Sequence, residues 1–388
     1  MEPMFLIPRT MQAIVYRGAN DLRLETVPVP RIGSGELLVR VAACGVCPTD
    51  IKKIHYGTVP PPRIFGHETA GTIVRTGSRV RQLKVGERVA LHHHVPCLEC
   101  HACRHQAFAQ CAQYKRTGIT AGFEPAGGGY AEYVRVMPFV LPGVVRIPAR
   151  NTFLEGAMLE PVNTVLKAVK RLALLRGDTV LVAGQGPIGL MFTRLLALQG
   201  MRVVATDLLA RRLELARELG AVAGYRAESK VQSLKSKVQA HASGLKDRGS
   251  CITDRKLSAL VHKLTCGRGL DAAVIAVPSD AVVRQAQALV RGAGQVLLFS
   301  HTRRGDRTPL DLATVCVDEK DLIGSYSSEF RLQEEVARLV FSRKLDARRL
   351  ITHQFSLPQT AAAIELASHP TAESLKVVVV QGLDERSG

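Results

Sequence analysis

The stretch TVLVAGQGPIG, residues 179–189, decides the fold of this chain. The apolar run TVLVA predicts a buried strand, and a helix is expected to begin near Ile188, directly after glycines at 184 and 186. The spacing GxGxxG is a weak signal by itself, but a strand before it and a helix after it are the context that a dinucleotide-binding turn requires. These residues therefore predict a turn that binds the phosphates of a dinucleotide.

Each glycine of this turn has its own physical task. Gly184 allows the tight turn, Gly186 lets the backbone approach a pyrophosphate, and Gly189 lets the helix pack close to the strand. The amide groups and partial positive charge of the helix N-terminus then favour anionic phosphates. We expect the contacts to come from Gly184, Gly186, Pro187, Ile188 and Gly189.

Asp207 ends the next predicted strand, about 20 residues beyond the glycines, where an acidic side chain binds the adenosine ribose hydroxyls. A carboxylate at this place repels a 2′-phosphate, which favours NAD over NADP. Arg211 and Arg212 follow closely and could receive such a phosphate. We therefore expect Asp207 and Arg212 to belong to the cofactor site.

The style of the sequence changes near residue 163. Residues 1–162 contain short β-branched runs separated by Gly and Pro, which is typical of an antiparallel β-rich domain. Residues 163–301 alternate strands with helices, which predicts a parallel sheet covered on both faces. Residues 302–388 return to a mixed style and are expected to pack back onto the first domain. A lysine-rich stretch at about 226–256 interrupts the second domain and is interpreted as a solvated insertion.

A run of four cysteines predicts a structural metal site. Cys97, Cys100, Cys103 and Cys111 lie within the single segment CLECHACRHQAFAQC. Four thiolates satisfy a tetrahedral zinc completely, so this site should be closed and should stabilise the fold.

Cys47, His67 and Glu68 form a second group with different chemistry. A thiolate, an imidazole and a carboxylate normally leave one position of a zinc ion open for water or for a substrate oxygen. We therefore expect two unlike zinc sites in the chain, of which this one does chemistry.

Composition excludes several classes of protein. The net charge of +18 attracts anions, but the basic residues are spread along the chain and form no stripe interleaved with aromatic residues, so a dedicated nucleic-acid partner is not expected. No apolar stretch approaches the roughly 20 residues that cross a bilayer. The first ten residues do not resemble a secretory signal, and the nine cysteines suit a reducing compartment, so a cytoplasmic protein is expected.

Several motifs follow one another in a familiar order: GVCPTD (45–50), GHE (66–68), the cysteine run, LEP (159–161), VAGQGPIG (182–189) and LITH (350–353). In these motifs the chain resembles the zinc-containing medium-chain alcohol and polyol dehydrogenases over nearly its whole length. It looks most like the sorbitol and threonine dehydrogenase branch, because Glu160 stands where other alcohol dehydrogenases have a cysteine ligand. The resemblance implies an α/β fold, with a GroES-like β-rich catalytic domain and a Rossmann doubly wound parallel sheet.

The resemblance also implies which residues act. Cys47 and His67 would hold the catalytic zinc, with a water and either Glu68 or Glu160 completing its ligands; which glutamate binds directly stays open. Thr49 would take the proton of the alcohol.

Other positions support or depart from the family pattern. Asp50 is expected to orient the metal site. Lys52 stands where several relatives end their proton relay with a histidine, so the exit route stays open, with His55 as one candidate. Glu155 is interpreted as an exposed acid at a helix start, and Tyr130 either lines the substrate pocket or packs.

The expected activity is transfer of hydride from a secondary alcohol to NAD, giving a ketone. A polyol, cyclitol or sugar alcohol is the expected substrate. L-threonine or another amino alcohol is the alternative within the same branch, and a non-catalytic cationic binding module is the alternative of another class. A homodimer or homotetramer is expected from the family, without a membrane partner.

Overall fold

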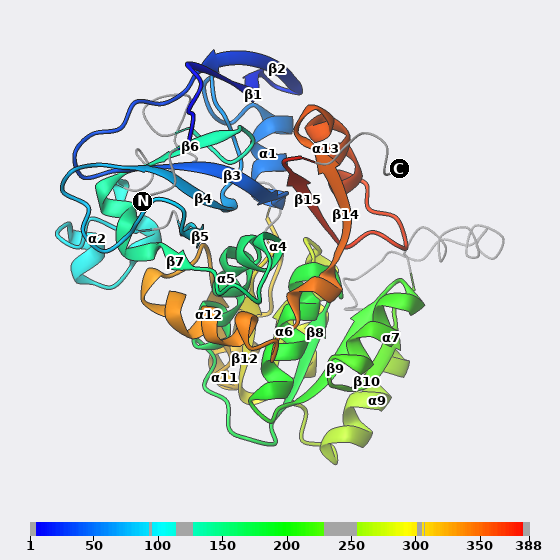
Figure 1. Ribbon diagram of the computed structural model, residues 1–388. Coiled ribbons are helices and arrows are strands. Elements are labelled where there is room, and N and C mark those ends of the chain that lie inside the picture. The colour runs from blue at the N-terminus through cyan, green and yellow to red at the C-terminus, as the bar shows by residue number, and fades with distance from the viewer. Residues whose placement is uncertain are drawn as a thin grey trace. The chain divides into compact units, whose positions relative to one another are not determined.

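The computed structural model describes residues 5–92, 95–113, 127–228, 254–300, 305 and 307–382. The expected insertion at about 226–256 lies almost entirely outside the described residues. The chain divides into two compact units, which are Met1–Thr164 with Ser327–Gly388, and Val165–Tyr326 (Figure 1).

The first unit is built on β-sheets. A two-stranded antiparallel sheet pairs β1 (Thr10–Gly18) with β2 (Asp21–Pro28). A seven-stranded sheet runs in the order β14-β15-β3-β4-β5-β7, and β6 pairs with β3. Its strands are β3 (Leu37–Gly45), β4 (Glu68–Thr76), β5 (Arg88–Ala90), β6 (Tyr133–Val136), β7 (Val145–Arg146), β14 (Ile351–Ser356) and β15 (Lys376–Val380).

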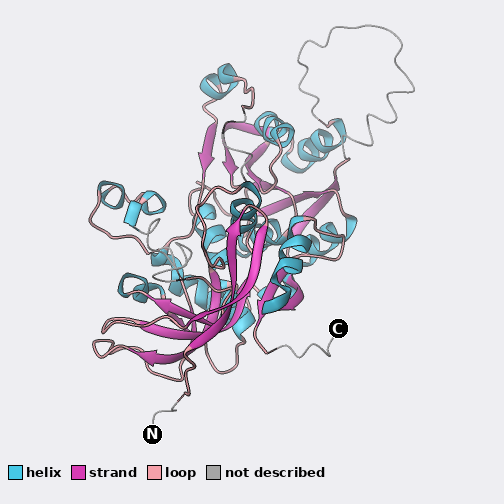
Figure 2. Ribbon diagram, turned by 90° about the horizontal axis from the view of Figure 1, so that it is seen from above, coloured by secondary structure: helices cyan, strands magenta, loops and turns pink. Residues whose placement is uncertain are grey.

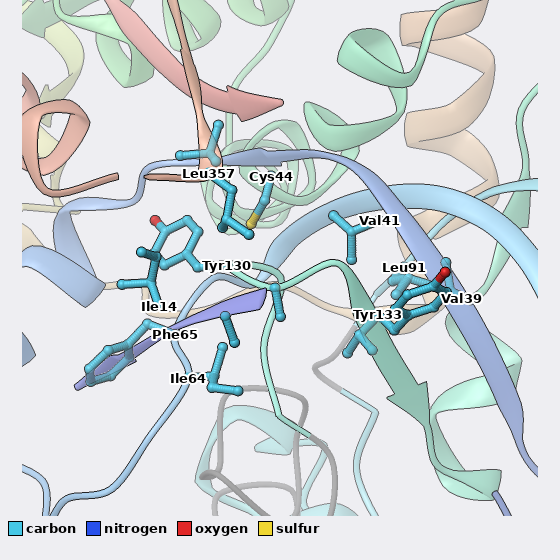
Figure 3. Close-up of a cluster of buried hydrophobic side chains, with 14 of the residues drawn as sticks. Ile14, Val39, Val41, Cys44, Ile64, Phe65, Leu91, Tyr130, Tyr133 and Leu357 are labelled. Carbon is cyan, nitrogen blue, oxygen red and sulfur yellow. The ribbon is translucent and has the colours of Figure 1, made fainter. Parts of the chain in front are cut away.

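The core of this unit is formed largely by residues of these strands, and the central strands β3 and β4 are buried along most of their length. Figure 3 shows Tyr130 beside Cys44 in this cluster. Tyr130 is fully buried, and its hydroxyl donates to the carbonyl of Gly45 at 3.3 Å. Of the two expectations for Tyr130, the structure therefore supports packing. Burial also raises the pKa of its phenol well above the usual value.

Short helices connect the strands of the first unit. They are α1 (Pro48–Tyr56), α2 (His101–Arg104), η1 (Phe108–Gln110), η2 (Pro138–Gly143), α4 (Phe153–Ala157), η3 (Phe330–Leu332), α12 (Gln333–Phe341), η4 (Ala347–Leu350), η5 (Leu357–Gln359) and α13 (Thr360–Ser368). Helix α5 (Leu159–Val169) crosses the division between the two units.

Glu155 occupies the predicted helix start but is buried, so the expectation of an exposed acid was wrong. Its carboxylate accepts from the backbone of Thr152 at 2.7 Å and from Asn151 at 2.9 Å, and Arg343 pairs with it at 3.1 Å. Although burial acts to raise the pKa of Glu155, these donors hold it below the usual value. Arg343 lies far along the chain, so the sequence near Glu155 carries no sign of this pairing.

The second unit is a six-stranded parallel sheet in the order β10-β9-β8-β11-β12-β13. Its strands are β8 (Thr179–Ala183), β9 (Arg202–Asp207), β10 (Ala221–Arg226), β11 (Leu270–Ile275), β12 (Val290–Leu298) and β13 (Asp321–Gly324). Its other helices are α6 (Pro187–Leu198), α7 (Ala210–Glu218), α9 (Arg255–Thr265), α10 (Asp280–Leu289) and α11 (Leu312–Val317). This strand order is that of a Rossmann sheet. Helices and strands both make up the chain (Figure 2), and the predicted α/β fold class is confirmed.

The point at which the chain returns from the second unit to the first differs from the expected one. Residues 302–388 are predicted to pack back onto the first domain, whereas the first unit resumes only at Ser327, and β13 extends the parallel sheet by pairing with β12. Within the part of the chain that the structure describes, none of the helices has the length and apolar character that a bilayer crossing needs.

Substitution by alanine should destabilise the protein far more at Gly189 than at Gly186. A Cβ on Gly189 would lie 1.7 Å from the carbonyl oxygen of Gly184, whereas a Cβ on Gly186 would meet nothing within 4 Å. We expect Gly189→Ala to lower the free energy of unfolding by more than about 3 kcal/mol and Gly186→Ala to change it by less than about 1 kcal/mol. Denaturant unfolding measures both; equal losses would contradict the geometry.

Candidate active site and metal centres

Cys47, His67 and Glu68 come together in the first unit. One ligand atom from each lies within 4.8 Å of the other two. Cys47 is the N-cap of α1, where its Sγ accepts from the backbone N–H of Thr49 at 3.4 Å. His67 and Glu68 stand at the start of β4, which pairs with β3 just before Cys47. Two neighbouring strands thus bring residues 20 positions apart to one point, as zinc ligation requires.

Asp50 supports His67 from the first turn of α1. It is fully buried, and its Oδ2 lies 2.9 Å from Nδ1 of His67 and accepts from the backbone of Gly66 at 3.2 Å. Burial acts to lower the pKa of His67, but the charges of Asp50 and Cys47 raise it well above the usual value. With Nδ1 against the carboxylate of Asp50, Nε2 is the nitrogen of His67 that would bind a metal ion.

Glu68 has a buried partner that the sequence analysis missed. Lys376, the first residue of β15, places its ammonium 2.5 Å from Glu68 Oε2 and donates to the carbonyl of Val46 at 2.9 Å. Burial acts to lower the pKa of Lys376, but the charge of Glu68 raises it. Gly45 makes room for this pair, because a Cβ there would lie 1.9 Å from Glu68 Oε2.

Glu160, the other expected carboxylate, is buried on α5 in the same region. Burial raises its pKa to about 7, while the nearby charge of His67 acts in the opposite direction. Among the described residues it does not join the group in which all ligand atoms lie within 4.8 Å of one another. The geometry therefore favours Glu68 over Glu160 as a neighbour of Cys47 and His67.

Three further residues of the expected relay lie on α1. Thr49 and Lys52 are both half-buried and are separated by one helical turn. Burial lowers the pKa of Lys52. His55 bonds through Nδ1 to Asn20 and through Nε2 to Ser368 at 3.0 Å, so both of its ring nitrogens contact other parts of the fold.

The four-cysteine segment forms a second cluster. The Sγ atoms of Cys97, Cys100, Cys103 and Cys111 all lie within 4.8 Å of one another. Backbone N–H groups of Glu99 and Cys100 lower the pKa of Cys97 to about 6. Several thiolates this close would repel one another, and a zinc ion removes that repulsion, so the donor set fits a closed tetrahedral metal. Phe108 packs against this cluster, with Phe330 in an edge contact at 5.8 Å.

The glycine turn joins β8 to α6 in the second unit. Gly184 has a positive φ of 92°, and Gly186 precedes the helix, which begins with Pro187 and Ile188. The open space around Gly186 leaves its backbone accessible to a phosphate.

Asp207 lies at the end of β9, as predicted. Its Oδ2 accepts from the backbone of Gln185 at 2.6 Å and its Oδ1 from the backbone of Leu209 at 2.9 Å. Arg212 is half-buried on α7. The contact between Asp207 and Gln185 links the expected ribose acceptor to the glycine turn, which the sequence pattern alone did not indicate.

Two family models and a solved structure match this chain. Residues 33–148 match the family model of the alcohol dehydrogenase GroES-like domain, and residues 187–342 match that of the zinc-binding dehydrogenases. A crystal structure of a protein from Sinorhizobium meliloti 1021, solved bound to NADP, has a TM-score of 0.78 and 27% identity, covering 96% of this chain and all of that one.

Curated relatives match along the whole chain. Sorbitol dehydrogenase of Bacillus subtilis is 30% identical, over 96% of this chain and 98% of the relative. Erythritol/L-threitol dehydrogenase of Mycolicibacterium smegmatis is 29% identical, with the same coverage of both chains. The chain therefore belongs to the zinc-binding alcohol dehydrogenase family, and the predicted enzyme class, a zinc-dependent alcohol dehydrogenase, is confirmed.

Proposed function

We propose that this enzyme oxidises a secondary hydroxyl of a polyol, cyclitol or sugar alcohol to a ketone and transfers the hydride to NAD. The observation that carries the proposal is the group formed by half-buried Cys47 with buried His67 and Glu68, whose donor set suits a zinc ion with an open position. The names of the relatives, which act on sorbitol and on erythritol or L-threitol, support a polyol substrate.

Zinc held at this site supplies a Lewis acid that lowers the pKa of a substrate hydroxyl, and NAD supplies the hydride acceptor. We assign Cys47 and His67 as ligands and Asp50 as the residue that orients His67, because Asp50 faces its Nδ1. Glu68 is the third ligand in this proposal, since its carboxylate lies beside the other two. Glu160, buried nearby, then faces the ligands without binding the ion directly.

Thr49 is the proton acceptor in this proposal. Its Oγ1 takes the proton that the alcohol loses and passes it towards water, so that each turnover yields a ketone, NADH and one proton. Thr49 follows Cys47 closely in α1, and the half-burial of both residues is consistent with this role. His55, which contacts Asn20 and Ser368, suits a structural role better than a relay.

The dinucleotide is held by the glycine turn and Asp207. Gly184, Gly186, Pro187, Ile188 and Gly189 present backbone groups to the pyrophosphate in this proposal, and Arg212 adds positive charge nearby. The carboxylate of Asp207 favours NAD, because it repels a 2′-phosphate.

The second zinc is structural and is held by Cys97, Cys100, Cys103 and Cys111. The cysteines that the structure describes form no disulfide bonds, and their use as zinc ligands suits a reducing compartment such as the cytoplasm, which we propose for the enzyme.

We also propose a homodimer or homotetramer. Strand β13 is an edge of the parallel sheet, without a described neighbour on its outer side. Beside it in the chain, α11 leaves Leu312 70% and Val317 80% exposed. An edge strand with apolar neighbours is suited to self-complementary pairing with a second copy.

Cys47→Ser should abolish NADH formation from polyols while the protein stays folded. The replacement removes the soft ligand of the proposed reacting zinc, and we expect a loss of at least about 100-fold in kcat/KM, because catalytic metals provide several kcal/mol. NADH absorbance across hexitols, pentitols, cyclitols and threonine measures it. Cys266→Ser, at an exposed thiol, is the control and should keep full activity.

Two outcomes would redirect the proposal. Turnover of threonine with inert polyols would favour the amino-alcohol branch. A Cys47→Ser protein that still binds its ligands when the wild-type protein shows no turnover would favour a binding module.

Lys376→Met should destabilise the protein after its zinc is removed by a chelator. Glu68 would then be a buried charge without its cation, and we expect a loss of about 3–5 kcal/mol in the free energy of unfolding. The double variant Lys376→Met/Glu68→Gln removes both charges and should recover most of that loss, as chemical denaturation would show. Equal losses in the single and double variants would contradict the pairing.

Val317→Glu should shift the enzyme to a smaller assembly in sedimentation velocity, because a charge on the exposed apolar face of α11 opposes association. Val222→Glu is the matched control, since Val222 is 55% exposed on β10 at the opposite edge of the sheet. Unchanged sedimentation of Val317→Glu would place the contact elsewhere.

A further inference from the structure

The glycine turn contains a buried polar side chain. Gln185, between Gly184 and Gly186, is fully buried, and so is Thr193, two turns along α6. A side chain at this place in a turn has no need to be polar for the turn to form. Burying an amide and a hydroxyl is favourable only where their hydrogen bonds are made.

The side chain and the backbone of Gln185 make hydrogen bonds to three different elements. Its Nε2 donates to the carbonyl of Val182 in β8 at 2.9 Å, and its Oε1 accepts from Thr193 Oγ1 in α6 at 2.9 Å. Its backbone N–H donates to Asp207 Oδ2 in β9 at 2.6 Å. The turn is thereby tied to the strand before it, the helix after it and the neighbouring strand.

This arrangement fixes the part of the backbone that faces a phosphate. Gln185 immediately precedes Gly186, the N-cap of α6, and a Cβ on Gly186 would meet nothing within 4 Å. The turn is therefore held from its buried side and left open on the side of Gly186. A turn that is already ordered loses less conformational entropy when it binds an anion.

We propose that Gln185 and Thr193 are positioning residues that hold the glycine turn in the conformation that receives the pyrophosphate. This inference rests on the proposed use of a dinucleotide. The two side chains do not touch the ligand; they act through the backbone of Gly186. Losing the hydroxyl of Thr193 leaves Gln185 Oε1 buried without its donor, so the turn samples other conformations.

Binding of cofactor fragments separates this role from a general contribution to stability. ADP-ribose carries the pyrophosphate, whereas adenosine lacks it, so only ADP-ribose requires the ordered turn. We expect Thr193→Val to raise the Kd for ADP-ribose about 3- to 10-fold, as loss of one hydrogen bond implies. The Kd for adenosine should change less than twofold. In turnover, KM should rise for NAD and stay constant for the polyol.

Thr265→Val is the matched control. Thr265 is buried in the same unit, and its hydroxyl donates to the carbonyl of Val261 at 2.8 Å and accepts from the backbone of Gly269 at 3.1 Å, on α9. The control replaces the same hydroxyl and breaks two hydrogen bonds, so its cost in stability should be at least as large as that of Thr193→Val, yet both Kd values should match the wild type. Thr193→Ser keeps the hydroxyl and should restore ADP-ribose binding.

Each outcome decides the inference. Equal weakening of ADP-ribose and adenosine, or equal effects of Thr193→Val and Thr265→Val, would overturn it. Should Thr193→Val fail to fold, Gln185→Met removes the same hydrogen bond from the other partner. Its Kd values for ADP-ribose and adenosine are then compared in the same way. A wild-type protein that binds neither ADP-ribose nor NAD would instead overturn the proposed function.

Discussion

A thiolate, an imidazole and a carboxylate, from Cys47, His67 and Glu68, meet within 4.8 Å in the first unit, and much of the surrounding structure compensates for burying them. Asp50 faces the imidazole, and Lys376 faces the carboxylate. Buried charges are stable only when they are paired, so the site needs both Asp50 and Lys376. These partners offset the free-energy cost of bringing the ligands together. The group can therefore bind a zinc ion that keeps one coordination position open.

The two metal clusters divide their tasks by donor type. Four thiolates leave no position for a substrate, and their cluster packs with Phe108 and Phe330 into a small apolar core of its own. The mixed cluster lies instead at the start of β4 and of α1, where strand ends and a helix N-terminus supply ligands without a dedicated lobe. In the proposed function, one ion would thus stabilise a local fold, while the other would depend on a fold that is already formed.

Local sequence patterns were sufficient to predict the fold class, the glycine turn and both groups of candidate metal ligands. The residues of each feature are close in the chain or belong to motifs with fixed spacing. The partners of those residues were not predictable in the same way. Lys376 lies more than 300 residues from Glu68 and meets it only because β15 pairs with β3. Arg343 likewise explains why Glu155 is buried, which its place at a helix start did not suggest. Gln185 is the variable position of its motif, so spacing alone carries no information about its contacts.

Anomalous X-ray scattering at the zinc absorption edge, from crystals grown without chelators, would locate each zinc ion relative to its ligands. We expect one peak inside the four-cysteine cluster and a second peak about 2.0–2.3 Å from Cys47 Sγ, a His67 nitrogen and a Glu68 oxygen. A single peak at the four cysteines, with Cys47, His67 and Glu68 free of metal in active protein, would contradict this expectation.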